Sequence, residues 1–491
     1  MTYDLLIVGG GINGCAIARD AALNGWSVLL VERDDLASHT SSASTKLIHG
    51  GLRYLEHYDF GLVAHALRER ERLLRLAPHL IRPLTFVLPH ENAVRPWWLV
   101  RLGLLLYDWL GGLSSLPRSR GLKRSDTTYR APLKQARSGF VYSDAWVDDS
   151  RLTVLNALDA AEHGAEILTR TALESARRED GLWRARLSDG REVTARAIVN
   201  AAGPWVAELL GRVGVNAAAG VRLVKGSHIV VPRLFEGDHA YILQQPDRRI
   251  VFAIPYEDGT AVGTTDVVVE RPEDARIDAD EVRYLRDAVN RYFTRQVGPA
   301  DVTSSWSGVR PLYDDGASEA REVTRDYVLE LDENGPALLS VFGGKITTAR
   351  HLAEEAVAKV APALRRRAEP MTRERPFPGG GFRSFNAYLA HVRERRPWLG
   401  AERSERMVRA YGMLLDTIIA GVRNEAGMGE AFGAGLTERE ARWMREREWA
   451  RTPEDVLERR SKLGLHMTAA ERARFEAWWA EAFGRANALT A

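Results

Sequence analysis

The start of the chain shows an apolar run, a glycine-rich turn, a helical repeat and a second apolar run. Residues 5–8 form the continuous apolar stretch of a strand buried on both faces, and apolar residues recur with helical spacing over 12–22. Gly25 ends that helix, and residues 27–31 form a second strand. The pattern predicts a strand, turn, helix and strand, which is the first unit of an α/β domain.

Later parts of the chain carry other patterns. Residues 190–200 form a strand that runs into the turn NAAGPW, and the stretches between 221 and 266 alternate in a way that predicts an antiparallel sheet. The stretch 374–383 is typical of a linker, and the chain beyond it is helical and dense in arginine and glutamate. The patterns therefore predict a Rossmann-like α/β domain, an inserted antiparallel-sheet domain and a C-terminal helical domain.

Composition narrows the function classes. The chain has 491 residues, of which 68 are basic and 66 acidic, so it lacks the general field that would gather nucleic acid, and we expect no nucleic-acid partner. Cys15 is the single cysteine, which excludes an internal disulfide framework and a multi-cysteine metal cage, and we expect no metal site. The N-terminus lacks the basic region of a secretory signal, so we expect a cytoplasmic protein.

The most apolar segment, residues 94–113, is interrupted by Arg101 and Asp108 and falls short of the roughly 20 apolar residues of a spanning helix. Trp97, Trp98 and Trp109 are of the kind that settle at bilayer interfaces. Two interpretations stay open: a helix that lies on a membrane surface, and an ordinary amphipathic helix that covers a domain core.

The glycine turn after the first strand matches a phosphate-binding fingerprint. Gly9 permits the tight turn, Gly11 lets a pyrophosphate approach the backbone, and Gly14 lets helix and strand pack closely. The helix that follows directs its free N–H groups at the negative charge. Glu32 ends the second strand, where a carboxylate would accept hydrogen bonds from a ribose. These residues together predict a dinucleotide site.

The hydroxyl- and glycine-rich stretch 40–54 favours FAD over NAD. Ser41, Ser42, Ser44 and Thr45 can bind phosphate oxygens and ring edges, and the two glycines 50 and 51 would let the backbone lie against a flat ring. An NAD enzyme rarely follows its second strand with such a segment. The sequence therefore predicts a flavin against this backbone.

An ordered set of motifs carries a family resemblance. The set runs GGGINGCAIARDAA, TSSASTKLIHGGLRYLE, YSDAWVDDSRL, NAAGPW, KGSHIVVP, IVFAIPYEDGTAVGTTD, SGVRPL, TRDYVL and LSVFGGKITTAR. In this order the motifs resemble the FAD-dependent glycerol-3-phosphate dehydrogenases of the aerobic, respiratory type, which are amino-acid-oxidase-like flavoproteins. The likeness runs to about residue 365, and the helical tail fits the family more loosely.

The resemblance implies a domain division and an activity. FAD-binding pieces would span 1–75, 140–220 and 331–370, with a substrate or cap region over 76–139, a substrate domain over 221–330 and a helical domain over 371–491. The implied reaction is oxidation of sn-glycerol 3-phosphate to dihydroxyacetone phosphate, with hydride passing from C2 to flavin N5 and electrons to a quinone. The implied setting is peripheral, on the inner face of the cytoplasmic membrane, as a homodimer.

The resemblance also assigns roles to residues. It implies substrate contacts from Arg53, Tyr54, His228, Arg310, Arg325 and Lys345, with Arg310 and Lys345 acting in catalysis as well. The base is His49 or His228, between which the sequence does not choose. The predicted cofactor-binding residues are Gly9, Gly11, Ile12, Asn13, Gly14, Glu32, Thr40, Ser41, Ser42, Ser44, Lys46, Leu47, His49, Gly50, Gly51, Ala202, Gly203, Trp205, Gly344, Lys345, Ile346 and Thr347.

Three alternatives stay open. A glycerol-3-phosphate oxidase would carry the same motifs but use oxygen and release hydrogen peroxide. An amine or amino-acid oxidase of the same fold would need only residues that bind the substrate's carboxylate, in a pocket with fewer cationic side chains. A flavoprotein that senses nucleotides or binds nucleic acid without turnover would need a basic stripe interleaved with aromatics, and the helical tail mixes its charges too evenly for one.

Overall fold

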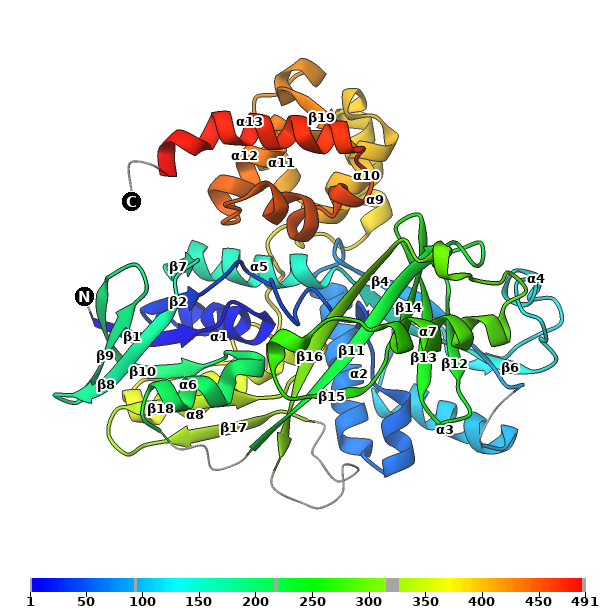
Figure 1. Cartoon of the computed structure of the whole chain (residues 1–491), viewed down its shortest axis with the longest axis horizontal. Coiled ribbons are helices and arrows are strands. Elements are labelled where there is room, and N and C mark those ends of the chain that lie inside the picture. Colours follow the sequence, from blue (N-terminus) through cyan, green and yellow to red (C-terminus); the bar gives the residue numbers. More distant parts are fainter. Residues whose placement is uncertain (1, 92–94, 216–219, 315–325, 488–491) are drawn as a thin grey trace.

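The computed structural model describes residues 2–91, 95–215, 220–314 and 326–487. In these ranges the chain forms two sheets that lie beside each other and a separate group of helices (Figure 1). This arrangement confirms the predicted fold class of an α/β domain, an antiparallel-sheet domain and a C-terminal helical domain.

The first sheet has the order β17-β18-β10-β1-β2-β7, with the β8–β9 hairpin beside β10. Its strands are β1 (Thr2–Val8), β2 (Val28–Glu32), β7 (Glu166–Thr169), β8 (Leu173–Glu179), β9 (Leu182–Leu187), β10 (Glu192–Asn200), β17 (Val328–Asp332) and β18 (Ala337–Phe342). Strands β18, β10, β1, β2 and β7 run parallel. The predicted strand, helix and strand at the start of the chain are confirmed as β1, α1 (Ile12–Leu23) and β2.

Helices cover both faces of this sheet. Helices α1, α5 (Asp149–Glu162) and α8 (Ala349–Leu364) share one core with Leu5 and Ile7 of β1. The alternate residues Leu6 and Val8 face the other side, toward α6 (Val206–Arg212) and the hairpin. Because each face of β1 buries apolar side chains, the strand reads as one continuous apolar run.

The second sheet has the order β15-β11-β14-β13-β12-β4-β6-β3, with β16 beside β11 and β5 beside β6. Its strands are β3 (Leu47–Ile48), β4 (Ile81–Pro89), β5 (Arg120–Gly121), β6 (Gly139–Val147), β11 (Gly220–Pro232), β12 (Ala240–Gln244), β13 (Ile250–Tyr256), β14 (Gly259–Gly263), β15 (Val267–Val269) and β16 (Ser304–Asp314). The antiparallel pairing expected between 221 and 266 is confirmed.

One strand, β6, belongs to a different sheet from the one that the predicted domain division implies. Strand β6 pairs with β4 along its whole length and so belongs to the second sheet, although the second FAD-binding piece was expected from residue 140. The short strand β3 joins β6 there as well. The return to the first domain comes at α5, because this helix packs against α1.

Helices also cover the second sheet. Helix α7 (Ala279–Tyr292) packs on one face, and α2 (Phe60–Leu76) and α3 (Trp97–Leu110) pack on the opposite one, while α4 (Thr127–Arg130) is a single turn. Among the helices that the structure describes, none has the length and apolar content needed to cross a membrane.

The C-terminal domain has its own apolar core. It contains α9 (Phe385–Arg395), α10 (Ala401–Tyr411), α11 (Leu414–Ile418), α12 (Glu438–Arg447), α13 (Ala469–Asn487), the small hairpin β19 (Ala431–Gly433) and β20 (Leu436–Thr437), and a π-helical turn over Asp455–Arg460. Figure 1 shows this domain at the top of the view, on the far side of α5 from the first sheet. The turn Asp455–Arg460 contacts α5, so the two domains meet there.

Candidate functional site

Two cavities lie where the strands of the first sheet end. A small cavity of about 130 Å³ is lined by the ends of β1, β2 and β10 and by the loop after β2. A large cavity of about 770 Å³ lies between the loop after β18, the segment 49–60 and strands of the second sheet. Ligands of open α/β sheets bind at the carboxyl ends of parallel strands, so both cavities lie where the fold expects a ligand.

The glycine turn forms one wall of the small cavity. Gly9 adopts a φ of +116°, and a Cβ atom on it would lie 2.3 Å from the carbonyl oxygen of Ala201. A Cβ atom on Gly14 would lie 1.9 Å from the carbonyl oxygen of Gly9. Both positions therefore require glycine, as the fingerprint predicts. Gly11 lines the cavity, and the N–H of Ile12 donates to Ser41 Oγ at 2.9 Å.

Glu32 lies at the opposite side of this turn. Its carboxylate accepts hydrogen bonds from the N–H of Gly10 at 2.6 Å and of Asp34 at 2.8 Å. Burial raises the pKa of Glu32 above its usual value, and these two N–H groups act in the opposite direction. The carboxylate is thus fixed on the cavity wall, and its contact with a ribose stays a prediction.

The remaining wall of the small cavity contains further predicted residues. Thr40, Ser41, Ala202, Gly203 and Trp205 line it. A guanidinium from Arg33 stacks over the Trp205 ring, 4.0 Å from its centroid. The wall thus combines hydroxyl groups with an aromatic and cationic surface, a mixture suited to a nucleotide.

Other predicted cofactor residues lie behind the cavity walls. Lys46 is buried, and its Nζ donates to Asp149 at 2.8 Å and to the carbonyl oxygen of Ser42 at 3.0 Å. Ser44 Oγ donates to the same carboxylate at 2.7 Å. The structure therefore places these side chains in an ion-paired cluster at the start of α5. Leu47 lies in β3, and Asn13 lies in the first turn of α1, where its Nδ2 donates to the carbonyl oxygen of Gly343 at 3.1 Å. Gly50, Ile346 and Thr347 lie in the loops that border the large cavity.

Cations gather at the polar end of the large cavity. Lys345 Nζ lies 4.1 Å from the ring centroid of Tyr54, and both residues line the cavity. Arg310 forms an ion pair with Asp266 while its side chain stays 43% exposed. Gly51 and Gly344 adopt positive φ values of 76° and 96°, which keeps this part of the wall free of side chains. The arrangement can hold an anion beside a flat backbone surface.

The two histidines that could act as base differ in position. His49 lines the large cavity. His228 is buried, and its ring stacks on Trp306 with centroids 4.9 Å apart. Between His228 and the cavity lies Thr45, whose Oγ1 is 3.0 Å from His228 Nε2. Burial lowers the pKa of His49, and burial with the nearby Lys46 and Arg310 lowers the pKa of His228 to about 3. Both imidazoles are therefore neutral near pH 7, and the strongly lowered pKa of His228 makes it a weak proton acceptor.

A buried network that the sequence analysis missed holds the backbone of the HGG segment. The N–H of Gly50 donates to Tyr107 Oη at 2.7 Å, and Tyr107 donates to Asp144 at 2.8 Å. Arg70 donates to the same carboxylate at 2.7 Å. These residues come from α2, α3 and β6, so no local motif unites them. The available signal was the isolated acid in the otherwise apolar strand FVYSDAWV. Arg222 is a further cation of the large cavity that was missed.

Two predicted arginines need separate mention. Arg325 lies outside the described residues. Arg53 lies in the short 3₁₀ helix Leu52–His57, next to Tyr54.

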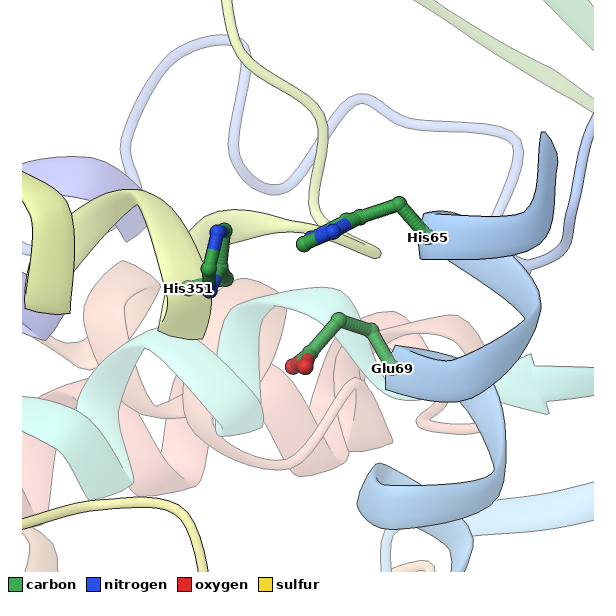
Figure 2. Close-up of side chains that lie close together, drawn as sticks. All are labelled: His65, Glu69 and His351. Atoms are coloured by element: carbon green, nitrogen blue, oxygen red, sulfur yellow. The ribbon is translucent and has the colours of Figure 1, made fainter. Parts of the chain in front are cut away.

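Figure 2 shows a cluster of His65 and Glu69 from α2 with His351 from α8, each offering a ligand atom within 4.8 Å of the others. Arg350 donates to both carboxylate oxygens of Glu69, at 2.7 and 2.8 Å, and Arg72 pairs with the same carboxylate. Because the positive charges of two arginines oppose a divalent cation, the cluster carries no argument for a metal site.

Comparison with known proteins places the chain in a family. The family model described as FAD dependent oxidoreductase matches residues 4–350. The chain is 51% identical over 483 residues to the glycerol-3-phosphate dehydrogenase of Pseudomonas aeruginosa, covering 96% of this chain and 94% of that protein. It is 50% identical over 490 residues to the D-erythritol 1-phosphate dehydrogenase of Brucella abortus, covering 97% and 98%.

A solved structure agrees with these relatives. The structure of the glycerol-3-phosphate dehydrogenase from Bacillus halodurans complexed with FAD has a TM-score of 0.79 to this chain at 27% identity, covering 98% of this chain and 91% of that one. The resemblance drawn from the ordered motifs is thereby confirmed. The chain belongs to the FAD-dependent oxidoreductase family.

Proposed function

We propose that the chain oxidises sn-glycerol 3-phosphate to dihydroxyacetone phosphate with bound FAD. The observation that carries the proposal is the large cavity, in which Arg310, Lys345 and His49 border one space beside the glycine-lined backbone. The cations fit a small phosphorylated alcohol, and the relatives named glycerol-3-phosphate dehydrogenase support that substrate.

The residues present fit FAD. At Gly9 and Gly14 the backbone packs too closely for a Cβ atom, and Gly344 leaves the backbone at the cavity edge without a side chain. Asn13 Oδ1 is buried and has no hydrogen-bond partner among the described residues, as expected of a polar atom that contacts a ligand. Glu32 and the small cavity would hold the adenosine half, and the segment 49–51 with 343–345 would border the flavin. When bound, the flavin supplies the acceptor for the hydride.

The side chains of this protein would bind and orient the substrate. The Arg310 guanidinium and the Lys345 ammonium would hold the phosphate away from the reacting carbon. His49, neutral and on the cavity wall, would accept the proton of the substrate hydroxyl. His228 lies behind Thr45, so we propose that it orients that hydroxyl-bearing wall. His49→Gln should then reduce kcat more than His228→Gln.

A direct experiment tests the activity. The purified yellow protein is mixed with glycerol 3-phosphate without oxygen, and the flavin absorbance is followed. We expect bleaching with glycerol 3-phosphate and none with glycerol or an amino acid. A protein that takes up FAD but keeps its absorbance with glycerol 3-phosphate would contradict the proposed substrate.

The 50%-identical relative favours a second substrate, D-erythritol 1-phosphate. Both substrates carry a phosphate and an alcohol, and the cations of the cavity suit either. Their kcat/KM values measured side by side decide between them. A higher value for the erythritol phosphate would move the assignment to that substrate.

We propose a quinone as electron acceptor and a membrane surface as the place of reaction. Helix α3 exposes Trp98 and Trp109, 64% and 66% accessible, along with the apolar residues Trp97, Leu99, Leu102, Leu105 and Leu106. Leu99, Leu102 and Leu106 also line the large cavity. An apolar acceptor could therefore pass between a bilayer and the flavin without crossing water. The oxidase alternative predicts hydrogen peroxide at the rate of turnover and no quinone reduction.

Vesicle cosedimentation tests the membrane contact. The double substitution Trp98→Ser and Trp109→Ser should release most of the protein from phospholipid vesicles. Leu465→Ser, which changes an exposed apolar residue of the C-terminal domain, is the matched control and should leave binding unchanged. We also propose a homodimer, as the family resemblance implies, and analytical ultracentrifugation would measure it.

A further inference from the structure

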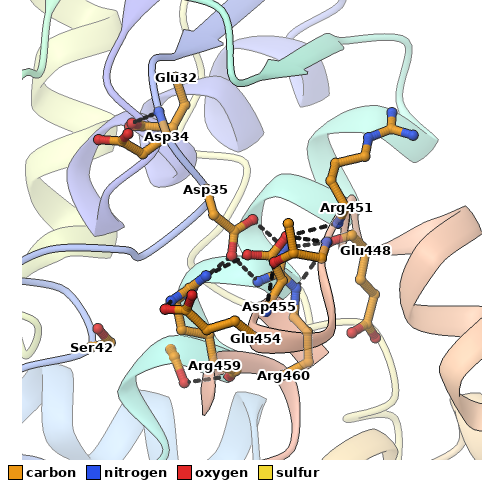
Figure 3. A network of polar contacts seen from close by, with 12 residues as sticks. Glu32, Asp34, Asp35, Ser42, Glu448, Arg451, Glu454, Asp455, Arg459 and Arg460 are labelled. Carbon is orange, nitrogen blue, oxygen red and sulfur yellow. Dashed lines mark hydrogen bonds and ion pairs between the residues drawn. The ribbon is translucent and has the colours of Figure 1, made fainter. Parts of the chain in front are cut away.

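One turn of the C-terminal domain contacts residues that adjoin the lining of the small cavity. This turn, Asp455–Arg460, lies against the loop that follows β2 (Figure 3). Its polar side chains join residues of two segments of the cavity wall.

The first segment is held through Asp35. This side chain is buried, and its two oxygens accept hydrogen bonds from Arg460 Nη1 and Nη2 at 2.6 and 2.7 Å. Arg459 Nε donates to the same carboxylate at 2.7 Å. Arg33 and Ala37, two residues before and after Asp35, line the cavity. Fixing Asp35 therefore fixes the loop that forms this wall.

The second segment is held through Arg170. Its Nη2 donates to both oxygens of Asp455, at 2.9 and 3.0 Å, and its backbone N–H donates to the carbonyl oxygen of Asp34 at 2.8 Å. The residues that follow, 171–173, line the cavity. The turn thus reaches a second segment of the cavity wall, which lies beside the β2 loop and is hydrogen-bonded to it.

Hydrogen bonds within the C-terminal domain hold the turn in place. Asp455 accepts hydrogen bonds from the N–H groups of Arg451 and Thr452 at 2.7 and 3.0 Å, and it pairs with Arg459. Arg460 also donates to the carbonyl oxygen of Glu448 at 3.0 Å through Nε. Because Asp455 and Arg460 are buried and fully engaged, a movement of one segment would break contacts to the other.

We propose that the turn Asp455–Arg460 is a brace that holds the β2 loop and the neighbouring segment after β7 in place on the wall of the small cavity, so that the C-terminal domain controls how long FAD is retained. Asp35, Arg459 and Arg460 are positioning residues in this brace. The inference rests on the proposal that the adenosine half of FAD occupies the small cavity, and it is independent of the substrate.

The test compares two isosteric substitutions in buried interdomain ion pairs. Asp35→Asn weakens the brace, whereas Glu448→Gln weakens the Arg151–Glu448 pair, which joins α5 to the C-terminal domain away from both braced segments. For each holoenzyme the rate of FAD release is measured by flavin fluorescence after dilution, and the melting temperature is measured beside it. We expect about tenfold faster release from Asp35→Asn, within the usual range of coupling between sites.

The control and the contrary outcomes are distinct. Glu448→Gln should keep the wild-type release rate even where it lowers the melting temperature as much as Asp35→Asn does. Equal release from both variants, at whatever rate, would overturn the brace. Should Asp35→Asn not fold, Arg170→Gln replaces it, because that side chain is 37% exposed and joins the other braced segment to Asp455 of the turn. A wild-type protein that retains no FAD would overturn the cofactor assignment, and with it the brace.

Discussion

Removing the hydroxyl of Tyr107 should loosen the HGG backbone without disturbing the surrounding core. Tyr107 Oη accepts a hydrogen bond from the N–H of Gly50 and donates one to Asp144. The substitution Tyr107→Phe keeps the ring, which packs edge-on against Tyr142. The change therefore isolates two hydrogen bonds from the packing of the aromatic cluster.

The magnitude follows from what each partner loses. The buried N–H of Gly50 is left without its acceptor, which costs about 1–3 kcal/mol, and the carboxylate of Asp144 loses one donor while it keeps Arg70. A local loss of about 2 kcal/mol corresponds to a factor of up to about 30 in the population of the opened segment. The segment that contains Gly50 should open more often by that factor.

Hydrogen–deuterium exchange read by mass spectrometry measures this opening. Peptides that cover residues 47–52 should exchange up to about 30-fold faster in Tyr107→Phe, while peptides from β1 keep their wild-type rate. Tyr142→Phe is the control, since it makes the same chemical change on the neighbouring ring, outside the hydrogen bonds of Gly50. Unchanged exchange in Tyr107→Phe, or an equal rise in both variants, would refute the network.

Three further predictions concern the substrate, the cofactor and the interface of the C-terminal domain. Arg310→Met should raise the KM for glycerol 3-phosphate about 10- to 100-fold, because a charge-assisted hydrogen bond to phosphate is lost, and should leave the flavin spectrum unchanged. Glu32→Ala should weaken FAD binding in an equilibrium titration, and unchanged affinity would contradict its assignment. His466 contacts Glu257 at 2.8 Å and Asp258 at 3.1 Å, and the hydrogen bond to Glu257 is the main cause of its raised pKa. Its stabilising effect is therefore present below the usual pKa of 6.5 and lost as the pH rises through the raised value. The difference in melting temperature between the wild type and His466→Gln should shrink from about pH 6 to about pH 9.

The sequence predicted those features that depend on local order. The turn at Gly9 and Gly14 could be predicted because a phosphate-binding turn needs glycine at fixed spacing, and backbone contacts at both positions leave no room for a Cβ atom. Strands between 221 and 266 could be predicted because one-sided burial leaves an alternating pattern. The pairing of β6 with β4 could not, because the pattern of a strand does not name its partner.

Side-chain direction was the second limit. The hydroxyl-rich stretch suggested that Ser44 and Lys46 face a cofactor, yet both contact Asp149 across more than a hundred residues of chain. The same residue types suit a ligand and a buried carboxylate, so composition alone does not decide between them. For the same reason, the ion pairs of Asp35 with the C-terminal domain could not be predicted from the sequence.

The strands of the first sheet come from distant parts of the chain, so the domain cannot be completed early in synthesis. Helix α1, which follows strand β1, shares a core with α8, and the proposed brace comes from residues 455–460. A nascent polypeptide therefore lacks the full core around α1 until α8 has been made, and it lacks the brace until residue 460 has been added. We therefore expect the cofactor to be retained only after residue 460 has been made, and translation products truncated before that point should be released without colour.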